Sequence, residues 1–223
     1  MTRVHDMGGR FGDGPVIPDP EGEVFHDDWH GRALALTLAA GALGQWNLDI
    51  SRHARERLGP DYNRFSYYEK WIAATADLLV ENGVLDASEL TGDAADAPHP
   101  LAARKLAAEA VSAALSRGGP VDRDTGPEPI FQPGQAVLVR RPADSQLVES
   151  GHTRLPAYAA GARGKVLRCH GNHILPDAHA HGLGEAPEPV YAVAFPASEL
   201  WAHPEHPCDE VVIDLWQSYL IAA

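Results

Sequence analysis

The residues of this sequence that are best suited to bind an acidic group are four arginines. Arg52, Arg55 and Arg57 lie close together, and Arg154 lies in the stretch Gly151-His152-Thr153-Arg154-Leu155-Pro156. A guanidinium group can donate two parallel hydrogen bonds to a planar or oxidised acid group. The alternative is that all four are solvated surface residues or ion-pair partners at helix ends, and composition alone favours this alternative.

A run of aromatic residues forms a second candidate feature. Phe65-Ser66-Tyr67-Tyr68 is followed by Trp71, and on a helix Tyr67 and Trp71 would share one face because they are four residues apart. Core packing is the more common use of such a face. The alternative is the wall of an apolar pocket with phenolic hydrogen-bond donors, which suits a small substrate with one polar end.

The chain has 12 histidines and two cysteines, and some of them gather in one stretch: Cys169, His170, His173, His179 and His181. Thiolate and imidazole groups could hold zinc or nickel, and Cys169 could act as a nucleophile. The spacing matches no standard zinc pattern, so we expect a polar, glycine-rich loop instead. The sequence contains no Gly-x-Ser-x-Gly elbow, phosphate loop or dinucleotide fingerprint.

These candidate residues must be positioned by helices in the first half of the chain. Apolar residues recur there at helical spacing. Asp27 and Asp28 can cap the first helix, and Gly41 and Gly44 end it. Three further helices are expected, at about residues 48–57, 66–81 and 102–115, the last because it is rich in alanine.

In the second half of the chain the hydrophobic period changes to two. Strands are expected at residues 136–139, 165–168, 191–195 and 211–215. Short strands joined by glycine-rich turns suggest a small β-barrel of roughly 90 residues. We therefore predict an α+β fold, with a Pro/Gly-rich extended arm at 1–26, a helical domain at 27–118, a linker at 119–129 and a β-barrel domain at 130–223.

Composition excludes several classes of function. The chain of 223 residues has 31 acidic and 18 basic residues, for a formal net charge of −13. This charge argues against binding to nucleic acid or to an anionic membrane surface. Two cysteines cannot form a disulfide framework, and the sequence shows neither a secretory signal nor a membrane-spanning stretch. We expect a soluble, cytoplasmic protein.

A series of short motifs, in order along the chain, resembles the β subunit of nitrile hydratase. The motifs of the first half are Val4-His5-Asp6-Met7-Gly8-Gly9, Phe25-His26-x-x-Trp29-His30, Ser51-Arg52-x-x-x-Glu56-Arg57-Leu58 and Tyr67-Tyr68-x-x-Trp71. Those of the second half include Gly151-His152-x-Arg154-x-Pro156-x-Tyr158, Gly161-x-x-Gly164, Pro176-Asp177, Tyr191-x-Val193-x-Phe195 and Asp214-Leu215-Trp216-x-x-Tyr219-Leu220. Each motif is short, and their common order over essentially the whole chain carries the resemblance.

The resemblance implies an enzyme that hydrates a nitrile to an amide. In this family the active site lies between an α and a β subunit. A non-haem Fe(III) or non-corrinoid Co(III) is held by a cysteine-rich loop of the α subunit, in which two cysteines are oxidised to sulfinic and sulfenic acids. A β subunit would then bring no metal ligand, would carry an SH3-like β-barrel, and would lay its arm across the α subunit in an αβ pair, expected as α2β2.

The resemblance also implies roles for particular residues. Arg52 and Arg154 match two arginines that hydrogen-bond the oxygens of the oxidised cysteines. Four others match positions around the substrate pocket: Leu48, Tyr67, Tyr68 and Trp71. Ser51 and Thr37 depart from the bulkier residues common in the family, which would widen the pocket or make it more polar.

Two other functions are compatible with the same motifs. One is a subunit of thiocyanate hydrolase, whose β-like sequence is divided between two chains, whereas here both halves are continuous. The other is a non-catalytic protein that escorts the α subunit during metal loading and resembles the helical half. Such proteins generally lack the barrel, whereas this chain has the motifs of both halves.

Overall fold

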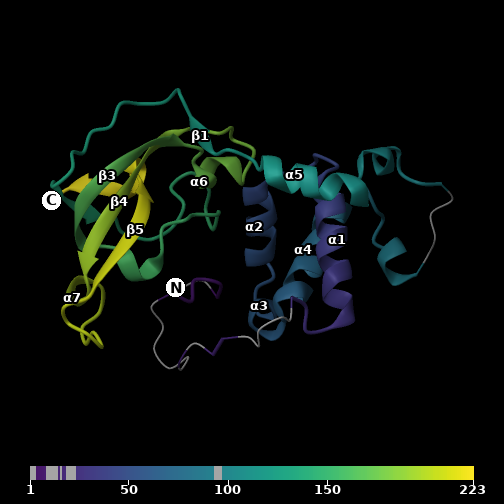
Figure 1. The fold of residues 1–223 in the computed structure, drawn as a ribbon, viewed down its shortest axis with the longest axis horizontal. Coiled ribbons are helices and arrows are strands. Elements are labelled where there is room, and N and C mark those ends of the chain that lie inside the picture. The colour runs from purple at the N-terminus through teal and green to yellow at the C-terminus, as the bar shows by residue number, and fades with distance from the viewer. Residues whose placement is uncertain (1–3, 9–14, 16, 19–23, 93–96) are drawn as a thin grey trace. The chain divides into compact units, whose positions relative to one another are not determined.

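The computed structural model describes residues 4–8, 15, 17–18, 24–92 and 97–223 (Figure 1). The chain divides into two compact units. The β unit contains residues 4–8 and 120–223, and the helical unit contains the described residues from 15 to 119. Most of the arm predicted at residues 1–26 lies outside the described residues. Among the described helices, none is both long and apolar enough to cross a membrane.

The helical unit is organised around its longest helix. Its α-helices before residue 83 are α1 (Asp28–Gly41), α2 (Leu48–Glu56), α3 (Asp61–Arg64) and α4 (Tyr67–Glu81). Helix α4 packs against both α1 and α2. Ala54 of α2 packs on Ala74 and Leu78 of α4 in a small core, and Trp46 and Ile50 cover it. The three helices predicted in this region are confirmed, and α3 is an additional turn.

Side chains close the N-terminal ends of the two helices that carry the candidate residues. The Asn47 side chain accepts a hydrogen bond of 2.8 Å from the Ile50 backbone N–H at the start of α2. At the start of α4, the Ser66 backbone N–H donates to Glu69 Oε2 at 2.6 Å, and this bond holds the pKa of Glu69 below its usual value. These bonds satisfy N–H groups that have no partner within the helix, so they fix where each helix begins.

The long helix predicted at residues 102–115 is wrong. In and before this stretch the structure has the 3₁₀ helices η1 (Glu89–Thr91), η2 (Pro100–Arg104) and η3 (Ala108–Ala110), followed by the short α5 (Val111–Arg117). Between η2 and α5 the backbone is extended at Lys105 and Ala107. Most side chains of this stretch are exposed. Without a buried face, alanine propensity does not hold a long helix together, because isolated helices are marginal in water.

The β unit is built on one antiparallel sheet. Its strands are β1 (Asp122–Arg123), β2 (Ala136–Val139), β3 (Arg163–His173), β4 (Glu188–Pro196), β5 (Glu210–Trp216) and β6 (Leu220–Ala222). The strand order is β5-β4-β3-β2-β6, and β1 pairs separately with β3. Figure 1 shows β3, β4 and β5 side by side. All four predicted strands are present, and the α+β class is confirmed.

The predicted closure of the sheet into an SH3-like β-barrel is not observed. In the described residues no ladder joins β5 to β6, which are the two ends of the strand order. The two strands follow one another in the chain with only the 3₁₀ turn η5 (Gln217–Tyr219) between them. This turn carries the chain from one end of the sheet to the other instead of folding it back as a hairpin. The sheet is therefore open.

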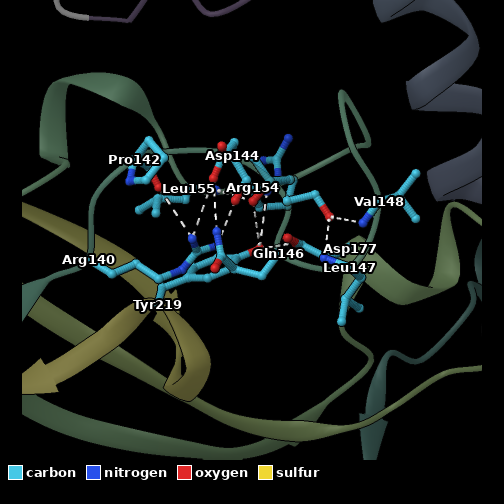
Figure 2. A network of polar contacts seen from close by, with 12 residues as sticks. Arg140, Pro142, Asp144, Gln146, Leu147, Val148, Arg154, Leu155, Asp177 and Tyr219 are labelled. Carbon is cyan, nitrogen blue, oxygen red and sulfur yellow. Dashed lines mark hydrogen bonds and ion pairs between the residues drawn. The ribbon is translucent and has the colours of Figure 1, made fainter.

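A group of polar residues lies inside the β unit, beside the apolar core. Tyr219 of η5 is fully buried, and Asp177 of the short helix α6 (Pro176–His179) is 2% exposed. The Tyr219 hydroxyl donates to Asp177 Oδ2, and the Arg140 guanidinium carbon lies 5.4 Å from the centre of the Tyr219 ring (Figure 2). Burial raises the pKa of Asp177, and burial together with the nearby Asp177 raises the pKa of Tyr219. The phenol therefore keeps its proton at neutral pH.

We expect Asn47→Ala to destabilise the helical unit by about 1 kcal/mol, because it removes the side-chain cap of α2. Urea unfolding followed by far-ultraviolet circular dichroism measures the change. The matched control is Asn63→Ala at an exposed position of α3. Equal stability of the two variants would show that the Asn47 cap contributes nothing.

Asp177→Asn should change how stability depends on pH. The folded-state pKa of Asp177 is raised, so the folded state keeps this proton to a higher pH than the unfolded chain does. The contribution of Asp177 to the free energy of unfolding is complete below the pKa of about 4 in the unfolded chain. It is lost as the pH rises through the pKa of Asp177 in the folded state. The stability of the wild type relative to Asp177→Asn should therefore fall with rising pH, in urea titrations at several pH values. The matched control is Asp209→Asn, at an exposed position.

Candidate functional site

The three arginines of the second helix have different surroundings. Arg57, at the end of α2, donates two hydrogen bonds of 2.8 Å to the Glu81 carboxylate at the end of α4. These bonds raise the pKa of Arg57 and lower that of Glu81. For Arg57 the helix-end ion pair considered from composition is what the structure shows, and its role is to join two helices.

Arg52 and Arg55 lie about one turn apart on α2 and have different partners. The Arg55 guanidinium carbon lies 5.1 Å from the centre of the Trp71 ring on α4, and partial burial lowers the pKa of Arg55. Arg52 Nη1 donates to Asp49 Oδ1 at 3.0 Å, one turn earlier in the same helix. Asp49 is buried, whereas the Arg52 side chain is 39% exposed. Asp49 thus anchors a guanidinium group that reaches the surface.

Helix α4 begins with a cluster of aromatic rings. The ring centres of Tyr67 and Trp71 are 5.4 Å apart, as their spacing predicted, and those of Tyr67 and Tyr68 are 5.2 Å apart. Tyr68 also contacts His30 of α1 at 4.7 Å between ring centres. Tyr67 is 62% exposed, so this end of the cluster is not core packing. The cluster could bind an apolar group beside a phenolic hydroxyl.

Three other predicted residues lie on the same helices. Leu48 is the first residue of α2 and is 56% exposed. The Ser51 hydroxyl accepts a hydrogen bond from Arg55 Nη1 at 3.3 Å, and the Thr37 hydroxyl donates to the Ala33 carbonyl at 3.0 Å. Thr37 Oγ1 also lies 3.4 Å from Thr75 Oγ1 of α4, so the Thr37 hydroxyl contacts a second helix.

Arg154 lies in the β unit, in a loop at residues 151–156 that has no helix or strand. Its side chain is exposed, whereas its neighbours His152 and Leu155 are buried. The Arg154 backbone N–H donates to the Tyr219 hydroxyl at 3.2 Å, and the His152 backbone N–H donates to His181 Nε2 at 2.8 Å. Figure 2 shows Arg154 and Leu155 beside Tyr219. Buried residues such as His152 and Leu155 fix the loop, and the Arg154 side chain is exposed on it.

Residues 4–8, the first described residues of the chain, pack against the residues that directly follow this loop. Asp6 Oδ2 accepts a hydrogen bond of 2.8 Å from the Ala157 backbone N–H, at the start of the 3₁₀ turn η4 (Ala157–Ala159). A side chain at Gly8 would meet the Tyr158 ring, with Cε1 at 2.9 Å from its Cβ. Tyr158 in turn stacks on Trp201, with ring centres 5.8 Å apart. Residues 4–8 therefore belong to the β unit, and the contact of the arm with a partner stays a prediction.

The stretch rich in histidine does not form a metal site in the described part of the chain. Cys169 and the neighbouring histidines do not bring three ligand atoms together. His170 Nε2 lies 3.0 Å from Asp214 Oδ1 on β5, and His181 accepts the backbone bond described above. Cys169 packs against the sheet core, and Cys208 is exposed. The expected loop is instead the end of β3 followed by α6.

Sequence reasoning did not single out Asp177, Tyr219 or Arg140 as functional candidates. Asp177 and Tyr219 are 42 residues apart, and Tyr219 and the Arg154 backbone are 65 residues apart. No local periodicity could bring them together. The only available signal was that Asp177 and Tyr219 stand in two of the short motifs, Pro176-Asp177 and Asp214-Leu215-Trp216-x-x-Tyr219-Leu220, whereas Arg140 stands in none of the motifs given above.

Comparison with known proteins agrees with the two-part organisation. Residues 1–114 match the family model "Nitrile hydratase beta subunit, N-terminal", and residues 120–222 match "Nitrile hydratase beta subunit, C-terminal". The chain is 36% identical to the low-molecular weight cobalt-containing nitrile hydratase subunit beta of Rhodococcus rhodochrous, over 100% of both chains.

Two further relatives extend this similarity. The chain is 38% identical to a nitrile hydratase subunit beta of Pseudomonas putida, over 99% of both chains. It is 33% identical to a cobalt-containing nitrile hydratase subunit beta of Pseudonocardia thermophila, over 99% of this chain and 96% of that one. Among solved structures, recombinant apo-thiocyanate hydrolase of Thiobacillus thioparus aligns with a TM-score of 0.40 and 19% identity, over 63% of this chain and 98% of that chain. The two family matches span nearly the whole sequence, and the chain belongs to the nitrile hydratase β-subunit family.

Proposed function

We propose that this chain and an α subunit together form a site that hydrates a nitrile, R–C≡N, to the amide R–CO–NH₂. The observation that carries this proposal is family membership over both halves of the chain. The β-subunit names of the relatives imply a heteromeric complex with an α subunit. An α2β2 assembly and a cytoplasmic location stay predictions, as do the domain boundaries at residues 26, 118 and 129.

The chemistry of the candidate site suits a chain that lies beside a metal without holding it. Two relatives are named as cobalt-containing. Arg52, Tyr67 and Trp71 offer guanidinium, phenol and indole groups, which are not the thiolate and imidazole groups that hold such metals. We infer that the α subunit holds the cobalt or iron. When bound there, the metal supplies a Lewis acid that polarises the nitrile or its attacking water.

Within this proposal, Arg52 and Arg154 donate hydrogen bonds to the oxygens of oxidised cysteines in the α subunit. A sulfenate is easily oxidised further or converted to a disulfide, so its charge and position have to be controlled. A guanidinium group does both, because it is always charged and its N–H groups form a rigid fork. The anchoring of Arg52 by Asp49, the partial exposure of the Arg52 side chain and the exposure of Arg154 support this role.

The aromatic cluster of α4 would bind the R group of the nitrile substrate. Leu48, Tyr68 and Trp71 offer apolar surface for the R group of the nitrile. The exposed Tyr67 hydroxyl could donate to, or accept from, the water or the developing amide. The ring contacts between Tyr67, Tyr68 and Trp71 support a single binding surface.

We expect Arg52→Lys to lower kcat for nitrile hydration by roughly a hundredfold or more in the co-expressed αβ complex, because lysine cannot form a two-pronged hydrogen bond. Initial rates of amide formation measure the effect. The matched control is Arg57→Lys at the end of the same helix, where the ion pair with Glu81 can be kept. This control should retain near-native turnover. A fully active Arg52→Lys complex would remove Arg52 from the site.

The purified chain without its partner should contain no stoichiometric cobalt or iron. The co-expressed complex should contain about one metal ion per αβ pair, as one metal-holding loop requires. Elemental analysis after treatment with a chelator distinguishes the two. Retention of one metal per isolated chain would contradict the assignment of the metal to the α subunit.

A further inference from the structure

The loop that carries Arg154 is held by side chains instead of by regular secondary structure. Tyr219 accepts a hydrogen bond from the Arg154 backbone N–H, and Thr153 Oγ1 accepts one from the Leu155 backbone N–H at 3.3 Å. The Thr153 hydroxyl itself donates to the Tyr219 hydroxyl oxygen at 3.2 Å. Two consecutive backbone N–H groups of the loop thus depend, directly or through Thr153, on one phenol.

The hydrogen-bonding capacity of the Tyr219 hydroxyl is fully used. Its oxygen accepts from the Arg154 backbone and from Thr153, and its proton is donated to Asp177. A phenol has one proton and can accept about two bonds, so all its positions are committed. Because Tyr219 and Asp177 are both buried, water cannot easily replace any of these partners.

The ring of Tyr219 is itself fixed in place. Trp216 packs edge-on against it, with ring centres 5.8 Å apart, and the Arg140 guanidinium lies over it. The Arg140 backbone N–H donates to the Tyr219 carbonyl at 2.9 Å, which ties η5 to the end of β2. The Arg140 side chain is held by the Asp144 carbonyl at 2.7 Å (Figure 2). The phenol oxygen therefore has a defined position relative to the sheet.

The start of the loop has a second, independent anchor. His181 accepts a hydrogen bond from the His152 backbone N–H. At Gly151 a Cβ atom would come within 2.7 Å of His181 Nε2 and 2.8 Å of the Val148 carbonyl oxygen. The backbone thus passes too close to its neighbours to allow a side chain at Gly151.

We propose that Tyr219 is a positioning residue for Arg154: its hydroxyl fixes the backbone from which the Arg154 side chain projects toward the α subunit. This inference rests on the role proposed above for Arg154. Tyr219 is buried, so it touches neither substrate nor metal and acts only through the loop. A displacement of about 1 Å in a positioned group can cost a hundredfold in rate, which is why the supporting bonds matter.

The test is Tyr219→Phe in the co-expressed αβ complex, which keeps the ring and removes the hydroxyl. We expect kcat to fall by roughly tenfold or more while KM for the nitrile changes by less than about twofold, because the loop and not the substrate surface is altered. The matched control is Tyr191→Phe. Tyr191 is equally buried, and its hydroxyl bonds Gln217 and the Ile130 backbone without reaching the loop. The control should keep near-native kcat.

Amide hydrogen exchange gives a readout that does not depend on the metal. In the full chain, the backbone N–H groups of Arg154 and Leu155 should exchange faster in Tyr219→Phe than in the wild type or in Tyr191→Phe. A second comparison uses Arg154→Lys. If Tyr219 acts through Arg154, the double variant Tyr219→Phe/Arg154→Lys should be no slower than Arg154→Lys alone, whereas an unrelated structural defect would multiply the losses.

The outcomes separate this inference from the proposed function. Near-native activity of Arg154→Lys would overturn the role of Arg154 and this inference with it, whereas a wild-type complex that forms no amide from a nitrile would overturn the proposed function. An inactive Arg154→Lys with a fully active Tyr219→Phe, or with unchanged exchange in Tyr219→Phe, would overturn only the role of Tyr219. If Tyr219→Phe does not assemble, Thr153→Val removes one bond to the same oxygen and the bond to Leu155. Wild-type kcat and exchange in Thr153→Val would then overturn the inference.

Discussion

A loop without helix or strand has backbone N–H groups that need hydrogen-bond partners from elsewhere, and in the β unit this need is met by a buried phenol. Tyr219 joins three parts of the unit that are distant in sequence: the loop at residues 151–156, the short helix α6 through Asp177, and the end of β2 through its carbonyl. The burial that raises the pKa of both Tyr219 and Asp177 also keeps the phenol protonated.

In the helical unit, packing and side-chain contacts between helices hold the elements that carry the candidate residues. Helix α4 provides the packing surface for α1 and α2, and its first turn carries the aromatic cluster. The same helix stacks Trp71 on Arg55 and pairs Glu81 with Arg57, so α2 is held at two points along its length. Arg52 precedes both of these contacts along α2 and donates a hydrogen bond to Asp49 of its own helix. The hydrogen bond to Asp49 restrains the Arg52 side chain, while its guanidinium group reaches the surface.

Local sequence signals were sufficient for the helix and strand positions that depend on local chemistry. Asn47 and Ser66 cap their helices, so α2 and α4 begin where expected, and alternating apolar residues located four strands. Signals that depend on distant partners were not sufficient. Alanine-rich residues 102–115 lack a surface to pack on, and the open sheet depends on how η5 redirects the chain. Spacing also could not separate Arg57, which pairs with Glu81, from Arg52. The roles of Arg52, Arg154, Leu48, Tyr67, Tyr68 and Trp71 stay predictions, because they concern a partner chain.

The contact of Asp6 and Gly8 with residues 157 and 158 has a consequence for the order of synthesis. Residues 4–8 leave the ribosome before the helical unit, but the surface on which they pack is made only after the entire helical unit. Since domains generally fold as they emerge, the helical unit can form while both ends of the β unit are still incomplete. The N-terminal residues must therefore remain available throughout translation, and anything fused to them would be carried into the final assembly of the β unit.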